Sequence, residues 1–221
     1  PFATIERLEY APDGSTIVVR ATKAERQVAV VGDHQSDSYE HMDGPIFSGD
    51  GKLWVYRGAK KRKWCAVING KKGPDVAEIA EVFISPDGSK VLYPAILDDG
   101  GAMFNGDEKG KTFAFVGNPV FSADGKQFAY PAWLGEKKIS VVVGTQASEL
   151  VFEELGKLYF SPDGRNVACR ARVGPEWFVA AGKKKSEPYD QVWAPVFSAD
   201  GKKVGFGARK GQDLWWVAMA L

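Results

Sequence analysis

The polar residues of this sequence could do only a few kinds of chemistry, and the histidines set the first limit. A serine or cysteine nucleophile is usually activated by a nearby histidine base. The chain has two histidines, His34 and His41, and no serine lies in the Gly-x-Ser-x-Gly segment that presents a hydrolase nucleophile. We therefore expect no catalytic residues and a protein that is not an enzyme.

Two acidic segments could in principle hold a metal ion. A loop could gather Asp33, His34, Asp37 and His41, although their spacing matches no established zinc pattern. The carboxylates at 98–99 could offer oxygen ligands to calcium, but Asp-Asp-Gly-Gly is also an ordinary hairpin tip. Solvated loops explain both segments more simply, and we expect neither a metal ion nor a cofactor.

A repeat accounts for the whole chain. Each copy contains a tetrapeptide close to Ser-x-Asp-Gly, with a short apolar run before it and an alternating apolar run after it. The glycines that end these tetrapeptides, called the turn glycines, are Gly14, Gly51, Gly88, Gly125, Gly164 and Gly201. Asp accepts hydrogen bonds from backbone N–H groups of its own turn, and Gly adopts the positive φ that ends the turn. The segment is therefore typical of β-hairpins and needs no catalytic explanation.

Each copy predicts a four-stranded antiparallel sheet. A third apolar run follows the hairpin, and a bulky fourth-strand residue lies 12 positions before the next turn glycine. These fourth-strand residues are Tyr39, Val76, Phe113, Phe152 and Tyr189. Units of this length that stack radially form a β-propeller. We therefore expect an all-β fold, a six-bladed β-propeller that forms a single domain over residues 1–221.

The two ends of the repeat predict how the ring closes. The last copy ends at Leu221, directly after its third strand, and so lacks a fourth strand. Phe2 lies 12 residues before Gly14, at the position of a fourth-strand residue. We expect residues 1–6 to pair with the C-terminal blade in a 3+1 closure that leaves no free edge. On this interpretation the propeller is complete, while a segment removed before Pro1, or further domains, remain an alternative.

The residues Phe-Ser-Pro-Asp-Gly at 160–164 resemble the repeat of the TolB-type, WD-repeat-like β-propeller family, and the resemblance extends over all six copies. Gly49, Ala123 and Ala199 replace the proline, and Ala11 replaces the serine. The resemblance implies a periplasmic protein-binding module, or a propeller attached to a serine peptidase, for whose hydrolase domain no residues remain here. A periplasmic or secreted location follows from this resemblance alone.

The two cysteines, Cys65 and Cys169, are too few for a disulfide framework. In a six-bladed ring they would lie in opposite blades, beyond the roughly 7 Å limit on the Cα separation of a disulfide. We therefore predict two free thiols.

Four tryptophans begin third strands: Trp64, Trp177, Trp215 and Trp216. We expect them to pack between blades, with a sugar-stacking surface as the alternative.

Composition and charge argue against two classes of partner. The 29 Lys and Arg residues nearly balance the 28 Asp and Glu residues, so net charge predicts neither a nucleic acid nor an anionic membrane as partner. No apolar stretch approaches the roughly 20 residues of a membrane-spanning helix. The lysine-rich segments 59–64 and 182–188 lie on different blades and opposite rims of the predicted disc. We expect no nucleic acid, no membrane insertion and a monomer.

Arginines gather on one rim of the predicted propeller, where the loops between second and third strands lie beside the crossovers between blades. Arginine forks suit carboxylate or phosphate groups, and arginine and tryptophan dominate interface hot spots. The candidate binding residues, called the arginine rim, are Arg7, Arg20, Arg57, Glu81, Asn118, Trp133, Lys157, Arg170, Arg172 and Arg209. Ordinary surface ion pairs with Glu25, Asp43, Glu81 and Glu176 are the alternative.

These residues predict a non-enzymatic scaffold that recognises a protein or peptide through the arginine rim and the mouth of the central channel. The alternative is a small-ligand or carbohydrate binder, or an enzyme of a propeller class, that uses Trp133, Arg170, Arg172 and Asp98.

Overall fold

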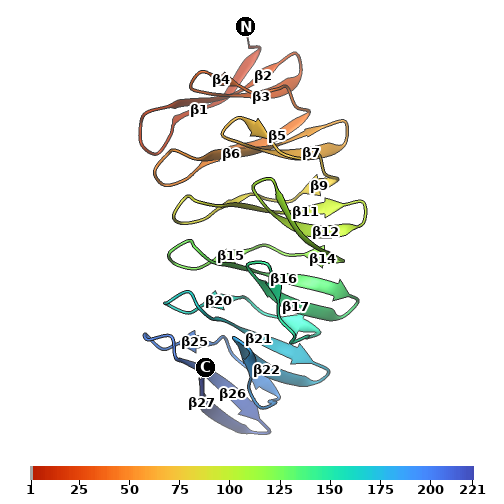
Figure 1. Cartoon of the computed structure of the whole chain (residues 1–221), viewed down its shortest axis with the longest axis vertical. Helices are drawn as coiled ribbons and strands as arrows, with labels where there is room; N and C mark the ends of the chain where they lie inside the picture. Colours follow the sequence, from red (N-terminus) through yellow and green to blue (C-terminus); the bar gives the residue numbers. More distant parts are fainter. Residues whose placement is uncertain (1) are drawn as a thin grey trace. The chain divides into compact units, whose positions relative to one another are not determined.

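The computed structural model describes residues 2–221 as two compact units, Pro1–Thr112 (unit 1) and Phe113–Leu221 (unit 2), which are treated separately below. The described residues form six sheets, numbered 1–6 along the chain, with three in each unit (Figure 1). No helix in this part of the chain is long and apolar enough to cross a membrane. The prediction of an all-β fold built from antiparallel sheets is confirmed.

The strands of unit 1 are β1 (Thr4–Tyr10), β2 (Ile17–Lys23), β3 (Arg26–Val31) and β4 (His34–Gln35) in sheet 1; β5 (His41–Phe47), β6 (Trp54–Lys60), β7 (Lys63–Ile68) and β8 (Lys71–Lys72) in sheet 2; and β9 (Glu78–Ile79), β10 (Phe83–Ile84), β11 (Val91–Leu97), β12 (Gly100–Asn105) and β13 (Glu108–Phe113) in sheet 3.

The strands of unit 2 are β14 (Phe115–Val116), β15 (Val120–Phe121), β16 (Phe128–Gly135), β17 (Lys138–Val143) and β18 (Gln146–Ala147) in sheet 4; β19 (Glu154–Leu155), β20 (Tyr159–Phe160), β21 (Val167–Val173), β22 (Glu176–Ala181) and β23 (Lys184–Lys185) in sheet 5; and β24 (Gln191–Val192), β25 (Val196–Phe197), β26 (Lys203–Lys210) and β27 (Asp213–Ala220) in sheet 6.

The Ser-x-Asp-Gly segments form the turn between the first and second strands of each sheet. In sheet 3 the Ser85 hydroxyl donates to Asp87 Oδ1 over 2.6 Å, and Ser85 Oγ accepts from the Lys90 backbone N–H over 2.9 Å. The Gly88 N–H donates to the Ser85 carbonyl, and Gly88 has a φ of 69°. In sheet 1, where Ala11 replaces the serine, Ser15 donates to Asp13 instead. These contacts confirm that the repeated tetrapeptide is a structural turn.

Turns of consecutive sheets also stack on one another within each unit. A Cβ added to Gly88 would lie 3.1 Å from Ser48 Cβ, and one added to Gly164 would lie 3.1 Å from Ser122 Cβ. Gly at these positions therefore supplies both the positive φ and the room for the preceding turn.

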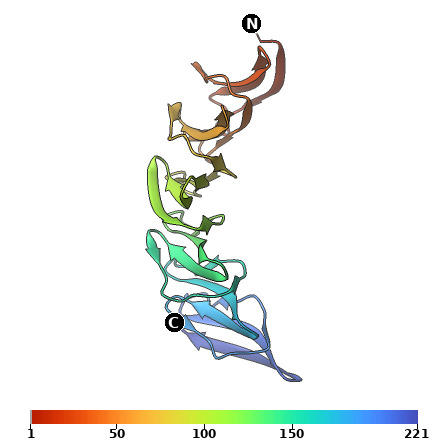
Figure 2. The same cartoon turned by 90° about the vertical axis from the view of Figure 1, so that its right-hand side faces the viewer.

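Alternate residues of each strand point to opposite faces of its sheet. We call the face toward the next sheet in the chain the forward face and the other the rear face. The forward face of sheet 2 presents Val55 and Ala66 to Tyr93 and Phe104 on the rear face of sheet 3. Sheets 1 and 2, 4 and 5, and 5 and 6 pack through the corresponding positions, so apolar layers lie between sheets within each unit (Figures 1 and 2).

The expected pairing of residues 1–6 with the C-terminal sheet is not found. Thr4 and Ile5 pair with Thr22 and Ala21 of β2. They belong to the same strand as residues 7–10, and the pairing of this strand with β2 continues on both sides of a bulge at Glu6. In the described residues, β27 pairs with β26 and has no strand on its other edge. Pro1 lies outside the described residues. In the described residues the last copy of the repeat ends with β27, its third strand.

The prediction for the four tryptophans is right for two of them. Trp64 and Trp177 are half-buried and pack against the cores of their units. Trp215 and Trp216 point to opposite faces of β27 and are 56% and 73% exposed; in the described residues β27 pairs only with β26.

We expect the free energy of unfolding to vary with pH because of the turn carboxylates. Hydrogen bonds from Ser85 and then from Ser89 lower the pKa of Asp87 from 3.8 to about 2. A carboxyl group whose pKa is lowered by folding stabilises the fold at pH values above its pKa in the unfolded chain. This contribution is lost as the pH falls to the pKa of the folded protein. The substitution Asp87→Asn should therefore destabilise the protein at pH 6, and its difference from the natural protein should shrink between pH 4 and pH 2. Urea unfolding at several pH values measures this. Asp98→Asn, at an exposed carboxylate outside the Ser-x-Asp-Gly turns, is the control. A difference for Asp87→Asn that does not change with pH would refute the idea.

The two cysteines are free, as predicted, and both are buried. Burial raises the pKa of the Cys169 thiol to about 12 and also raises that of Cys65. Because the thiolate is the reactive form, the folded protein should not react with a thiol reagent such as DTNB at pH 8, whereas two thiols should react after denaturation. Rapid release of one thionitrobenzoate from the folded protein would contradict the burial.

Candidate binding site

The arginine rim has members in both units. Arg7, Arg20, Arg57 and Glu81 lie in unit 1, and Asn118, Trp133, Lys157, Arg170, Arg172 and Arg209 lie in unit 2. The strand registers place the second-to-third-strand hairpins at the end of each sheet opposite the Ser-x-Asp-Gly turns, as predicted. The rim arginines of the two units differ in whether they have acidic partners within the chain.

Three rim arginines share one position in the repeat, six residues after a turn glycine: Arg20, Arg57 and Arg170. In sheets 1 and 2 an acidic residue lies eight residues before the same turn glycine and pairs with this arginine. Arg20 Nε lies 2.9 Å from Glu6 Oε2, and Arg57 Nη2 lies 2.6 Å from Asp43 Oδ2. In sheet 5 the corresponding residue is Gly156, so Arg170 has no acidic partner there.

Arg57 links sheet 2 to sheet 3 through hydrogen bonds. Its Nη1 donates to the backbone carbonyls of Ile79 and Ala80, and its guanidinium lies 4.9 Å from the centre of the Trp64 ring. Three kinds of partner therefore surround this side chain, and little of its donor capacity remains for a ligand.

The other two rim arginines of unit 1, Arg20 and Arg7, are also paired within the chain. Glu6, the partner of Arg20, accepts from the Thr22 hydroxyl over 2.7 Å, and this bond is the main cause of its lowered pKa. Arg7 Nη2 donates to Glu9 Oε2 over 2.7 Å. Surface ion pairing, the alternative weighed from the sequence, therefore describes these arginines, with Glu6, Glu9 and Asp43 as the acids.

Arg170 is the exposed exception. Its guanidinium lies 5.2 Å from the centre of the Trp177 ring, and its stem lies directly against Gly156, where an added Cβ would be 2.6 Å from Arg170 Cγ. Among the described residues it has no hydrogen-bond or ion-pair partner. Stacking on the indole limits the orientations of the guanidinium while its N–H donors remain available.

Arg172 also lies near Trp177. Its Nε and Nη2 donate to Glu154 Oε2 over 3.0 and 2.9 Å, and its Nη1 donates to the Gly174 carbonyl over 2.7 Å. The guanidinium is 5.7 Å from the Trp177 ring centre. Trp177 thus contacts two rim arginines, whereas the sequence analysis placed it between blades, or on a sugar-stacking surface, and not in the arginine rim. The recurrence of Arg and Trp seven residues apart, at 57 and 64 and again at 170 and 177, is the signal that could have identified it.

The remaining rim residues of unit 2 are less tightly held. Trp133 is half-buried with its ring edge against Phe115, at a centroid distance of 5.2 Å. Lys157 Nζ lies 5.6 Å from the Tyr159 ring centre. Asn118 and Arg209 are exposed, as is Glu81 in unit 1.

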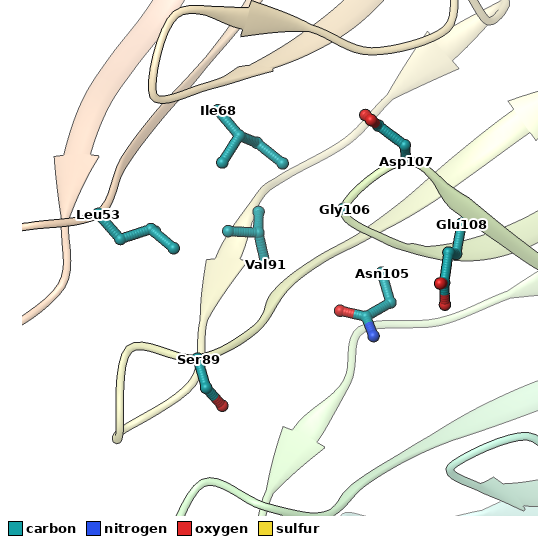
Figure 3. A pocket seen from close by; sticks show the side chains of 8 residues that line it. All are labelled: Leu53, Ile68, Ser89, Val91, Asn105, Gly106, Asp107 and Glu108. Atoms are coloured by element: carbon teal, nitrogen blue, oxygen red, sulfur yellow. The ribbon is translucent and has the colours of Figure 1, made fainter.

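Two hollows lie at the other end of the sheets. One of about 400 Å³ lies between sheets 2 and 3, where Figure 3 shows Leu53, Ile68 and Val91 facing a group that contains Asp107 and Glu108. The other, of about 690 Å³, lies between sheets 4 and 5. Their lining includes residues that adjoin the turns, such as Ser89 and Arg165, and no residue of the arginine rim.

The described residues contain no group of three or more His, Cys, Asp and Glu side chains arranged to hold a metal ion. His34, one of the candidate ligands, stacks on Trp54 with ring centroids 5.3 Å apart.

No family model matches the sequence, and no curated protein sequence matches it. Among solved structures, the chain is similar to TolB from Acinetobacter baumannii, with 17% identity and a TM-score of 0.40 over 99% of this chain and 61% of that one. It is also similar to the β-propeller domain of the Trilobed protease from Pyrococcus furiosus, with 15% identity and a TM-score of 0.43 over 99% and 83% of the two chains. The putative TolB from Agrobacterium tumefaciens gives 17% identity and 0.39 over 85% and 80%.

The chain therefore spans less than two thirds of the Acinetobacter protein. The family whose repeat the sequence resembles is named among these structures, at TM-scores of 0.39–0.43. These likenesses concern the fold, and the site is defined by the chain's own contacts.

The different surroundings of Arg57 and Arg170 predict different effects on stability. Arg57→Ala leaves the Ile79 and Ala80 carbonyls without their donor, and we expect a loss of about 1–3 kcal/mol in the free energy of unfolding. Arg170→Ala, at the same position of the repeat, should change it by only about 0.5 kcal/mol. Urea unfolding of both variants tests this, and equal losses would show that the two arginines are held alike.

Proposed function

We propose that the protein is a non-enzymatic scaffold that binds a protein or peptide through the unit 2 part of the arginine rim, with Arg170 as the carboxylate-binding residue. Trp177 positions the guanidinium, and Arg172 and Trp133 extend the same rim. The occupant that fits this arrangement is a peptide segment or protein surface with Asp or Glu side chains.

The single observation that supports this proposal is the glycine at position 156. At the same point of the repeat Glu6 and Asp43 neutralise Arg20 and Arg57. Gly156 leaves Arg170 stacked and unpaired, so a carboxylate from another molecule can take the place that Asp43 occupies in sheet 2. An exposed ion pair of this kind contributes about 0.2–1 kcal/mol, and a bidentate, stacked geometry favours the upper part of that range.

The position of the hollows favours a macromolecular partner over a small one. Small-ligand sites are usually concave and enclose most of the ligand. The lining of the hollows described above includes no rim residue, and the larger hollow extends from Arg165 near the turns to Cys169 and Phe152. A rim with an exposed arginine beside half-buried indole side chains instead has the composition of a protein-interface hot spot.

The alternative is a small-ligand or carbohydrate binder that uses the same rim, with Trp177 as the stacking surface. Participation of a channel mouth, a closed six-bladed ring and a periplasmic or secreted location remain predictions from the sequence.

We expect a fluorescein-labelled hexaglutamate peptide to bind the protein at low salt, and a hexaglutamine peptide to bind much more weakly. Arg170→Ala should weaken hexaglutamate binding about fivefold, the effect of losing an ion pair of about 1 kcal/mol. Gly156→Asp should weaken it to the same extent, because an aspartate there repeats the internal pair of Asp43 and Arg57. Fluorescence anisotropy measures each affinity.

Gly156→Asn is the matched control: either side chain must displace the Arg170 stem, which would lie 2.6 Å from an added Cβ, so only a larger loss of affinity for Gly156→Asp than for Gly156→Asn is attributed to the charge. Equal weakening by the Asp and Asn variants would show that bulk alone blocks the site. If Arg170→Ala leaves hexaglutamate binding unchanged while a glycan produces a saturable thermal shift that Trp177→Ala abolishes, the small-ligand alternative replaces the proposal.

A further inference from the structure

The larger hollow, of about 690 Å³, is lined by residues of unit 2 alone. Its volume lies within the range of roughly 300–1,000 Å³ that is usual for small-molecule sites. Val141 and Val143 of β17 line it from the forward face of sheet 4. Val167 and Cys169 of β21, with Ala180 of β22, line it from the rear face of sheet 5. The walls that these strands provide are therefore apolar.

This hollow reaches further between its sheets than the smaller one because sheet 5 has small residues where sheet 3 has aromatic rings. Tyr93 and Phe104 pair across β11 and β12, and their rings stack with centroids 5.1 Å apart. The pair at the same positions of the repeat in sheet 5 is Cys169 and Ala180. Both of these residues line the larger hollow, whereas neither aromatic ring lines the smaller one (Figure 3).

The two hollows also differ in charge. Asp107 and Glu108 line the smaller one, and Lys71 of β8 donates to Asp107 Oδ2, so an ion pair joins sheets 2 and 3 beside it. In sheets 4 and 5 the positions of Lys71 and Asp107 are occupied by Gln146 and Lys183. A glutamine and a lysine cannot form that ion pair, so Lys183 keeps its charge without the partner that this position has in unit 1.

Three exposed cationic side chains line the larger hollow, namely Arg165, Lys183 and Lys184. Arg165 Nε lies 3.9 Å from Asp163 Oδ2, and Lys184 Nζ donates to the Ala220 carbonyl over 3.1 Å. In the described residues Lys183 has neither a hydrogen-bond partner nor an ion-pair partner. Glu149 is the acidic residue of the lining. The cations outnumber it, and the edge of this apolar hollow is therefore positively charged.

We propose that this hollow binds a small molecule that has an apolar body and one anionic end group, such as a long-chain carboxylate. The apolar body lies against Val143, Val167 and Ala180, where its removal from water favours binding. The anionic group lies at Lys183 and Arg165, which can donate charge-assisted hydrogen bonds to it. The site is distinct from the arginine rim, whose residues do not line the hollow, and it goes beyond the function proposed above.

Dodecanoate, used below its micelle-forming concentration, is the probe, and isothermal titration calorimetry measures its affinity. The natural protein should bind it at one saturable site. Octanoate should bind at least about tenfold more weakly, because each buried CH₂ group contributes about fourfold to the affinity. Dodecyltrimethylammonium has the same chain with the opposite charge, and it should also bind at least about tenfold more weakly.

Substitutions inside the hollow and at its edge locate the bound probe. Ala180→Phe places a ring where sheet 3 has Phe104 and should abolish dodecanoate binding, whereas the smaller Ala180→Val should only weaken it. The double variant Arg165→Gln, Lys183→Gln should weaken binding about tenfold, the effect of losing two exposed ion pairs. Lys126→Gln is the matched control, because Lys126 has the repeat position of Arg165 in sheet 4, does not line the hollow and should leave the affinity unchanged.

Thermal unfolding followed by circular dichroism establishes that each variant is folded. No saturable binding of dodecanoate would overturn the proposal, as would equal affinity for dodecyltrimethylammonium. A folded Ala180→Phe variant that binds dodecanoate as the natural protein does would place the ligand elsewhere and would also overturn it. If Ala180→Phe does not fold, the exposed Arg165→Gln, Lys183→Gln variant decides, and its unchanged affinity would overturn the proposal.

Discussion

A serine hydroxyl donates to an aspartate Oδ1 over 2.5–2.6 Å in five of the six turns, and a glycine with positive φ completes each turn. These turns fix where the second strand of each sheet begins relative to the first. Because side chains alternate along a strand, a slip of one residue would move every apolar side chain to the other face. The turns therefore determine which residues point forward and which point to the rear, and the apolar layers between sheets depend on them.

The same register determines the chemistry of the rim. An arginine six residues after the turn glycine and an acid eight residues before it meet across two neighbouring strands, as Arg57 and Asp43 do. When glycine takes the acidic position, as at 156, the arginine stays in place but loses its internal partner. A binding position thus arises from the omission of one carboxylate in an otherwise regular array, and neither a catalytic motif nor a deep cavity contributes to it.

The sequence by itself determined the strand order within each sheet, the turns and the free state of Cys65 and Cys169, because these follow from residue spacing and local turn chemistry. It also located the arginines at one end of the sheets. Only the tertiary structure decided which arginines have partners within the chain. Arg57 donates to the backbone carbonyls of Ile79 and Ala80, which lie in the next copy of the repeat, and a backbone carbonyl cannot be recognised from the type of its residue. It likewise decided that Thr4 and Ile5 pair with β2, because the spacing of Phe2 from Gly14 allows two partners for this segment and strand pairing between distant segments is settled by packing.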